Sequence, residues 1–236
     1  MKKLRIPAAC VLLLAAFTAI ILHVYRNFTA EPGVPVMTEA ARSGPTLVID
    51  AGHGGLDGGA SAADGTLESA LNLQIALRVE QLAKLFGVST VMTRSSEALD
   101  YPDESATIHA KKVWDQKTRV ALINSTENAL LLSIHQNTYP DARPNGTEVL
   151  YAKTDGSKEL AELTHANLIN CLNPENRRVA APISDAIYLM KSVDCTAILV
   201  ECGFLSNPAE TEKLKSGTYQ TQLAAVLVGS FLQYSF

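Results

Sequence analysis

Short apolar runs alternate with segments of helical periodicity along residues 46–236, and this alternation constrains the fold more than any other feature. Residues 46–50 form an apolar run that ends in a glycine-rich loop, a pattern that indicates a buried parallel strand. Residues 68–86 carry apolar side chains at helical spacing. Further strands are expected at 88–92, 129–134, 146–151, 186–190 and 197–200, and further helices at 111–124, 157–172, 208–215 and 219–231. The pattern predicts one α/β domain with a mixed, mostly parallel, twisted sheet and helices on both faces.

The first 45 residues differ from this domain. Residues 1–5 are basic, and residues 6–24 are almost wholly apolar. A helix of that length covers roughly 28 Å, close to a bilayer core, and the positive flank places its N-terminus inside the cell. We expect a cytoplasmic tail at 1–5, a transmembrane anchor or uncleaved signal at 6–24, a linker at 25–45 and the main domain at 46–236, outside the cell membrane.

A cleaved signal peptide is the alternative for this segment, and it would make the protein secreted. Its candidate site, Phe28-Thr29-Ala30, has a bulky Phe where a small residue is preferred. The sequence therefore favours a single-pass anchor, and both alternatives place the main domain outside the cytoplasm.

Charge and cysteine content exclude several classes of protein. The net charge is −4 and no basic face is evident, so nucleic acid is not an expected partner. Cys171, Cys195 and Cys202 are an odd number without CxxC spacing, which argues against a disulfide framework and against a thiolate zinc site. One disulfide among the three stays open.

Three expected strands lead into residues that bind metals or move protons. They are followed by His53, His135 and Glu201, while Glu68 begins the first long helix. Taken singly, a His at a strand end is more often structural, and a Glu at a helix start usually favours the helix dipole. A carboxylate after an apolar strand is costly to bury without a partner. Because ligands of α/β sheets bind beyond the carboxyl ends of the strands, the joint placement favours a metal site.

The chemistry of these residues suits zinc. A catalytic zinc site has three protein ligands and one open position, and His53, Glu68 and His135 would provide the three. Zinc lowers the pKa of a water molecule to about 7 and polarises a carbonyl group, which leaves Glu201 to accept and return a proton. The glycines at 52–59 could instead form a phosphate-binding loop, but this stretch fits neither the G-x-x-x-x-G-K-[ST] nor the G-x-G-x-x-G motif. The residues alone thus predict metal-assisted hydrolysis.

Several motifs in this order resemble one family, the zinc-dependent N-acetylmuramoyl-L-alanine amidases of the Amidase_3 type. The matching stretches span about 45–236 and are Val48–Ala60 (VIDAGHGGLDGGA), Glu68 with Asn72-Leu73, Thr93-Arg94, Ser133–Asn137 (SIHQN) and Leu199–Pro208 (LVECGFLSNP).

The resemblance implies that His53, Glu68 and His135 bind Zn²⁺ and that Glu201 is the catalytic glutamate. It also implies that the substrate is peptidoglycan and that the bond cut is the one between muramic acid and L-alanine. Arg94, Asn137 and Asn207 match motif positions and are interpreted as residues that support the ligands or fix loops.

Two departures from the family narrow the resemblance further. The stretch 151–186 leaves little room beyond one helix and a loop, so we expect no inserted helix that blocks the site. No repeat-type wall-binding domain is recognisable. A short anchored catalytic domain is similar to the sporulation amidases that help to make muramic-δ-lactam in spore cortex and are thought to need an activating partner protein.

Two alternative functions stay open at this point. One is a zinc peptidase that cuts within the stem peptide. The other is a peptidoglycan-binding module without catalysis, against which the presence of Glu201 argues.

Overall fold

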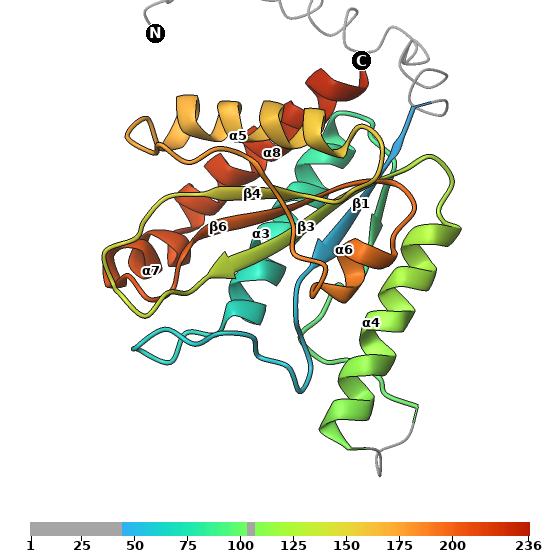
Figure 1. Ribbon diagram of the computed structural model, residues 1–236, viewed down its shortest axis with the longest axis horizontal. Helices are drawn as coiled ribbons and strands as arrows, with labels where there is room; N and C mark the ends of the chain where they lie inside the picture. The colour runs from blue at the N-terminus through green and yellow to red at the C-terminus, as the bar shows by residue number, and fades with distance from the viewer. Residues whose placement is uncertain (1–43, 103–106) are drawn as a thin grey trace, which may run out of the picture. The chain divides into compact units, whose positions relative to one another are not determined.

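The computed structural model describes residues 44–102 and 107–236. They form a domain with one mixed β-sheet (Figure 1). Its strands are β1 (Thr46–Ala51), β2 (Thr90–Met92), β3 (Ala129–Asn137), β4 (Glu148–Tyr151), β5 (Ala181–Pro182) and β6 (Thr196–Phe204), in the order β2-β1-β3-β6-β4-β5. The pairs β2/β1, β1/β3, β3/β6 and β4/β5 are parallel, while β4 is antiparallel to β6. The expected mixed, mostly parallel sheet is confirmed.

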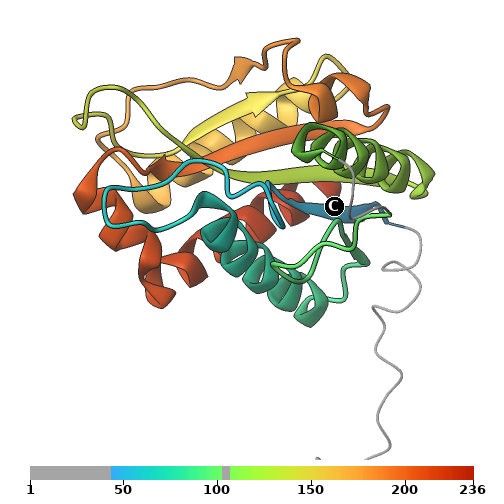
Figure 2. The same ribbon diagram turned by 90° about the horizontal axis from the view of Figure 1, so that it is seen from below.

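Helices cover both faces of this sheet (Figures 1 and 2). One face packs against α3 (Glu68–Leu85), α5 (Ser157–Leu172) and α8 (Gly217–Ser235), and the other against α4 (Ile108–Ser125) and α6 (Tyr188–Ser192). Along β1, Leu47 and Ile49 enter the first core and Val48 the second, because successive strand side chains point to opposite faces. A short helix, α7 (Pro208–Lys215), follows β6.

The two central strands are longer than expected, and this places the candidate residues in register. β3 continues past residue 134 to Asn137, and β6 continues past residue 200 to Phe204. As a result, His135 and Glu201 are paired neighbours on adjacent parallel strands.

The expected strand at 186–190 is wrong. Leu189 and Met190 lie in α6, where both are buried against the second core, and the strand beside β4 is β5. The alternating pattern of residues 146–151 predicts an edge strand, and this is also wrong, because β4 lies between β6 and β5. Helix α4 begins three residues earlier than expected, since the Thr107 side chain accepts a hydrogen bond from the Ala110 N–H and caps it.

The N-terminal expectations fall outside the described residues. These are the tail at 1–5, the anchor at 6–24 and nearly all of the linker at 25–45. Within 44–102 and 107–236, no helix has both the length and the apolar character needed to cross a membrane. Cys171, Cys195 and Cys202 are all free thiols.

Candidate metal centre

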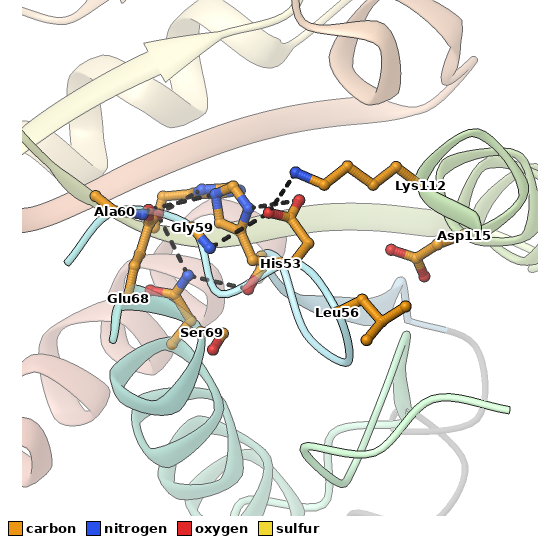
Figure 3. A network of polar contacts seen from close by, with 12 residues as sticks. His53, Leu56, Gly59, Ala60, Glu68, Ser69, Lys112 and Asp115 are labelled. Atoms are coloured by element: carbon orange, nitrogen blue, oxygen red, sulfur yellow. Dashed lines mark hydrogen bonds and ion pairs between the residues drawn. The ribbon is translucent and has the colours of Figure 1, made fainter. Parts of the chain in front are cut away.

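Three side chains from three elements meet at the carboxyl end of the central strands. His53 lies in the loop after β1, Glu68 is the first residue of α3, and His135 lies near the end of β3. Their potential ligand atoms all lie within 4.8 Å of one another. The Glu68 Oε2 atom is 3.3 Å from His53 Nε2, and Glu68 Oε1 is 3.0 Å from His135 Nδ1. Figure 3 shows Glu68 beside His53 at the start of α3. The structure therefore brings together the three ligands predicted from the sequence.

The electrostatics of this cluster fit a bound cation. Burial raises the pKa of Glu68, but hydrogen bonds to His135 and His53 and their charges outweigh it and hold the pKa well below its usual value. Burial lowers the pKa of His53, yet the hydrogen bonds and charges of Glu68 and then of Asp57 raise it overall to about 9. The ionised carboxylate thus attracts positive charge, and two imidazoles with one carboxylate are a donor set that zinc prefers.

Backbone groups hold the Glu68 carboxylate in place. Oε2 accepts a hydrogen bond from the Ala60 N–H at 2.9 Å, and Oε1 accepts one from the Gln136 N–H at 3.1 Å. Because these donors come from the glycine-rich loop and from β3, both flanks of the cluster are tied to Glu68.

Glu201 lies beside the cluster with an unused oxygen. Its Oε2 atom is shielded from solvent and has no hydrogen-bond partner among the described residues. Burial raises the pKa of Glu201 to about 7; nearby histidines oppose this shift, and the charges of Glu68 and Glu148 add to it. A carboxyl group with this pKa exchanges a proton readily near neutral pH, as a general acid or base must.

The four residues open into one pocket of about 460 Å³. Its other lining residues include Gln116 from α4, Asn137 from β3 and the segment 186–190 with α6. A hollow of this size accommodates part of a substrate next to the reacting groups.

The glycine-rich loop must approach the ligands closely. A Cβ atom at Gly52 would collide with the His135 imidazole, and one at Gly59, where φ is +68°, would collide with Glu68 and His53. His53 itself has a φ of 62°, an uncommon conformation for a residue with a side chain. Surrounding contacts must therefore stabilise the loop.

Two buried arginines provide these contacts. Arg94, predicted as a supporting residue, donates to the carbonyl oxygens of Ala51 at 2.8 Å and Gly52 at 3.1 Å. Arg119 of α4 donates to the carbonyl oxygens of Ala51 at 2.8 Å and His53 at 2.6 Å. Arg94 thus fixes the loop backbone rather than a ligand side chain, and Arg119 was not predicted.

Arg119 is the centre of a buried ionic network. Its guanidinium lies 2.8 Å from Asp50 and 3.0 Å from Asp115, and Asp50 also accepts hydrogen bonds from Ser133 and Thr93. Burial raises the pKa of Asp50, but the Arg119 charge and these hydrogen bonds lower it to about 2. The only signal in the sequence is Asp50 itself, because an acid at the end of an apolar strand needs a partner.

The two asparagines singled out from the motifs lie in different places. Asn137 donates to Glu148 Oε2 at 2.9 Å and so holds the strand neighbour of Glu201. The Asn207 side chain caps α7 and donates to the Pro144 carbonyl oxygen, so none of these contacts reaches a predicted ligand. Their roles, like those of the ligands, stay predictions.

The comparisons with known proteins agree on one family. Residues 47–230 match the family described as N-acetylmuramoyl-L-alanine amidase. The germination-specific N-acetylmuramoyl-L-alanine amidase of Bacillus subtilis is 34% identical over 193 residues, which cover 81% of this chain and 80% of that protein.

Two solved structures have the same fold and more than 30% identity. The CwlD amidase of Clostridioides difficile, solved in complex with the GerS lipoprotein, has a TM-score of 0.76 and 33% identity over 80% of this chain and 98% of that one. An N-acetylmuramoyl-L-alanine amidase from Clostridium difficile 630 has a TM-score of 0.69 and 31% identity over 81% of this chain and 96% of that one.

Proposed function

Because the chain belongs to the N-acetylmuramoyl-L-alanine amidase family, we propose that it cleaves peptidoglycan by zinc-dependent hydrolysis. The bond is the amide that joins the lactyl group of N-acetylmuramic acid to the L-alanine of the stem peptide. One observation carries the zinc dependence: His53, Glu68 and His135 offer ligand atoms within 4.8 Å of one another, beside the Glu201 carboxyl group, whose Oε2 atom has no hydrogen-bond partner in the described part of the chain.

The residues of the site have different roles in the proposed reaction. Two imidazoles and the Glu68 carboxylate hold the metal, which when bound lowers the pKa of a water molecule and polarises the scissile carbonyl. Glu201 accepts the proton of the attacking water and returns it to the nitrogen of the leaving L-alanine. Arg94 and Arg119 hold the loop that presents His53.

A digest of purified peptidoglycan tests the bond that is cut. We expect new L-alanine amino termini and muramic acid with free lactyl carboxyl groups. A peptidase would leave muramoyl-alanine intact and shorten the stem peptide. A binding module would be retained on the wall without releasing any product.

Glu201→Gln tests the assignment of the general base. The variant is expected to retain zinc and to lose roughly 10²–10⁴-fold in turnover. Glu175→Gln is the matched control, because the Glu175 side chain is 94% exposed and has no predicted role in the reaction. Turnover of Glu201→Gln at the parent rate would show that another group moves the proton.

A spore-cortex role with a protein partner is the finer proposal. It is supported by the germination-specific relative and by the similarity to an amidase solved with a lipoprotein. Deletion of the gene in the source bacterium is expected to remove muramic-δ-lactam from the cortex, and cross-linking in sporulating cells is expected to capture an activating protein. An unchanged cortex would refute this role while leaving the amidase activity intact.

We also propose that residues 6–24 anchor the protein in the cell membrane with its catalytic domain outside. The apolar length and the basic flank of this segment support the proposal. The full-length protein is expected in the membrane fraction and is expected to be cut by protease added outside the cytoplasm. Recovery in the soluble cytoplasmic fraction would contradict it.

A further inference from the structure

The two ring nitrogens of His53 face two different carboxylates. Nε2 lies 3.3 Å from Glu68 Oε2, on the side where the three ligands converge. Nδ1 lies 3.0 Å from Asp57 Oδ2, on the opposite side of the ring. Since an ionised carboxylate only accepts hydrogen bonds, the contact with Asp57 requires a proton on Nδ1. Nε2 also faces an ionised carboxylate, so the two contacts compete for the proton of a neutral ring. With a cation in place of the proton on Nε2, the hydrogen bond to Asp57 would keep the proton on Nδ1 and leave the lone pair of Nε2 for the cation.

The Asp57 carboxylate is fixed through its other oxygen. Oδ1 accepts a hydrogen bond from Lys112 Nζ at 2.8 Å and one from the Gly59 N–H at 3.3 Å. Figure 3 shows Lys112 reaching from α4 towards the loop that carries His53. Two donors therefore hold one oxygen and leave the other oxygen for the imidazole.

We propose that Asp57 is a positioning residue that sets the tautomer and the ring orientation of His53, so that Nε2 is available to zinc, and that Lys112 holds Asp57 for this task. The inference rests on the zinc site proposed above. A hydrogen bond from the second nitrogen of a ligating histidine to a carboxylate fixes the ring and makes it a stronger ligand.

Asp57→Asn separates this role from a purely structural one. The amide has almost the shape of the carboxylate, but only its oxygen accepts hydrogen bonds. If that oxygen faces Lys112 and Gly59, the NH₂ group points at Nδ1 and favours the tautomer with its proton on Nε2. If the amide turns round, its NH₂ group meets the Lys112 ammonium and the Gly59 N–H. Either orientation sets two donors against each other.

Zinc affinity is measured on the purified full-length protein by competition with a chromogenic chelator, and thermal unfolding is measured on the metal-free protein. Asp57→Asn is expected to weaken zinc binding roughly 10–100-fold, at least as much as Asp57→Ala, with little change in the melting temperature. Adding Lys112→Met to Asp57→Asn is expected to restore part of the affinity, because the amide is then freer to turn. Asp64→Asn is the matched control, since it removes a carboxylate–lysine pair of the same loop that touches no predicted ligand.

Three results would overturn the inference. They are parent affinity in Asp57→Asn, a milder effect in Asn than in Ala without any rescue by Lys112→Met, and a fall in the metal-free melting temperature that accounts for the whole loss of affinity. A parent protein that binds no zinc would instead refute the proposed zinc site, and the inference with it.

Discussion

Replacing Arg119 with methionine is expected to destabilise the fold severely. The side chain is 2% exposed, as is that of its partner Asp50. Methionine fills part of the space but removes the nearest cation, so that among the described residues only the Ser133 and Thr93 hydroxyls still donate hydrogen bonds to the Asp50 carboxylate. The variant thus buries a carboxylate that has lost its ion-pair partner.

The magnitude follows from that unpaired charge. Removing one partner of a buried ion pair typically costs 3–5 kcal/mol, because the remaining charge stays desolvated. Arg119 also donates to two loop carbonyl groups, so a loss of about 4 kcal/mol is expected, a large part of the ~5–15 kcal/mol that stabilises a typical domain. The double variant Asp50→Asn with Arg119→Met is expected to recover part of this loss, since the Asp50 position is then neutral and the Asp115 carboxylate alone still lacks its Arg119 partner.

Urea unfolding of the metal-free protein measures both variants against the parent. Arg177→Met is the matched control, because the Arg177 side chain is 77% exposed and its ion pair at 3.6 Å is expected to contribute little. A loss below 1 kcal/mol for Arg119→Met, or a double variant less stable than either single variant, would refute the account of the network.

Three further predictions concern pH and glycines. The pKa of Asp50 is about 2 in the folded protein against a usual 3.8, so its ionisation contributes about 2 kcal/mol to stability above pH 4, and this contribution is lost as the pH falls towards 2. The difference in the free energy of unfolding between the parent and Asp50→Asn should therefore shrink from pH 4 to pH 2, and a constant difference would contradict this. Gly52→Ala should weaken zinc binding in chelator competition, since the added Cβ collides with the His135 imidazole; unchanged affinity would contradict that close approach. Gly229→Ala should raise stability to urea by about 0.5–1 kcal/mol, because Gly229 is an exposed position inside α8 with open space around it; a loss of stability would contradict this.

The sequence was sufficient to predict the convergence of the metal-centre residues for a topological reason. His53, His135 and Glu201 each follow or end an apolar strand, and parallel strands bring such positions to one edge. Which strands are neighbours also matters, and this was not predicted: the in-register pairing of His135 with Glu201 depends on β3 lying beside β6.

The supporting residues were harder to predict, because their partners are set by packing between elements distant in sequence. Arg119 reaches Asp50 only because α4 packs on the sheet face that carries Val48 of β1, and Lys112 reaches Asp57 from the same helix. Nothing in the local pattern of α4 distinguishes these cations from solvated ones.

The region from 181 to 192 shows where periodicity alone is insufficient. A five-residue apolar segment fits a strand and one turn of helix equally well. Tertiary packing decides here, since Leu189 and Met190 of α6 are buried in the second core together with Ile123 of α4.

Anomalous diffraction at the zinc absorption edge, from crystals of the zinc-loaded protein, tests the central claim most directly. The account predicts one strong peak at about 2.0–2.2 Å from a nitrogen of His53, an oxygen of Glu68 and a nitrogen of His135. A peak coordinated by other residues, or none at this cluster despite stoichiometric zinc in solution, would contradict it.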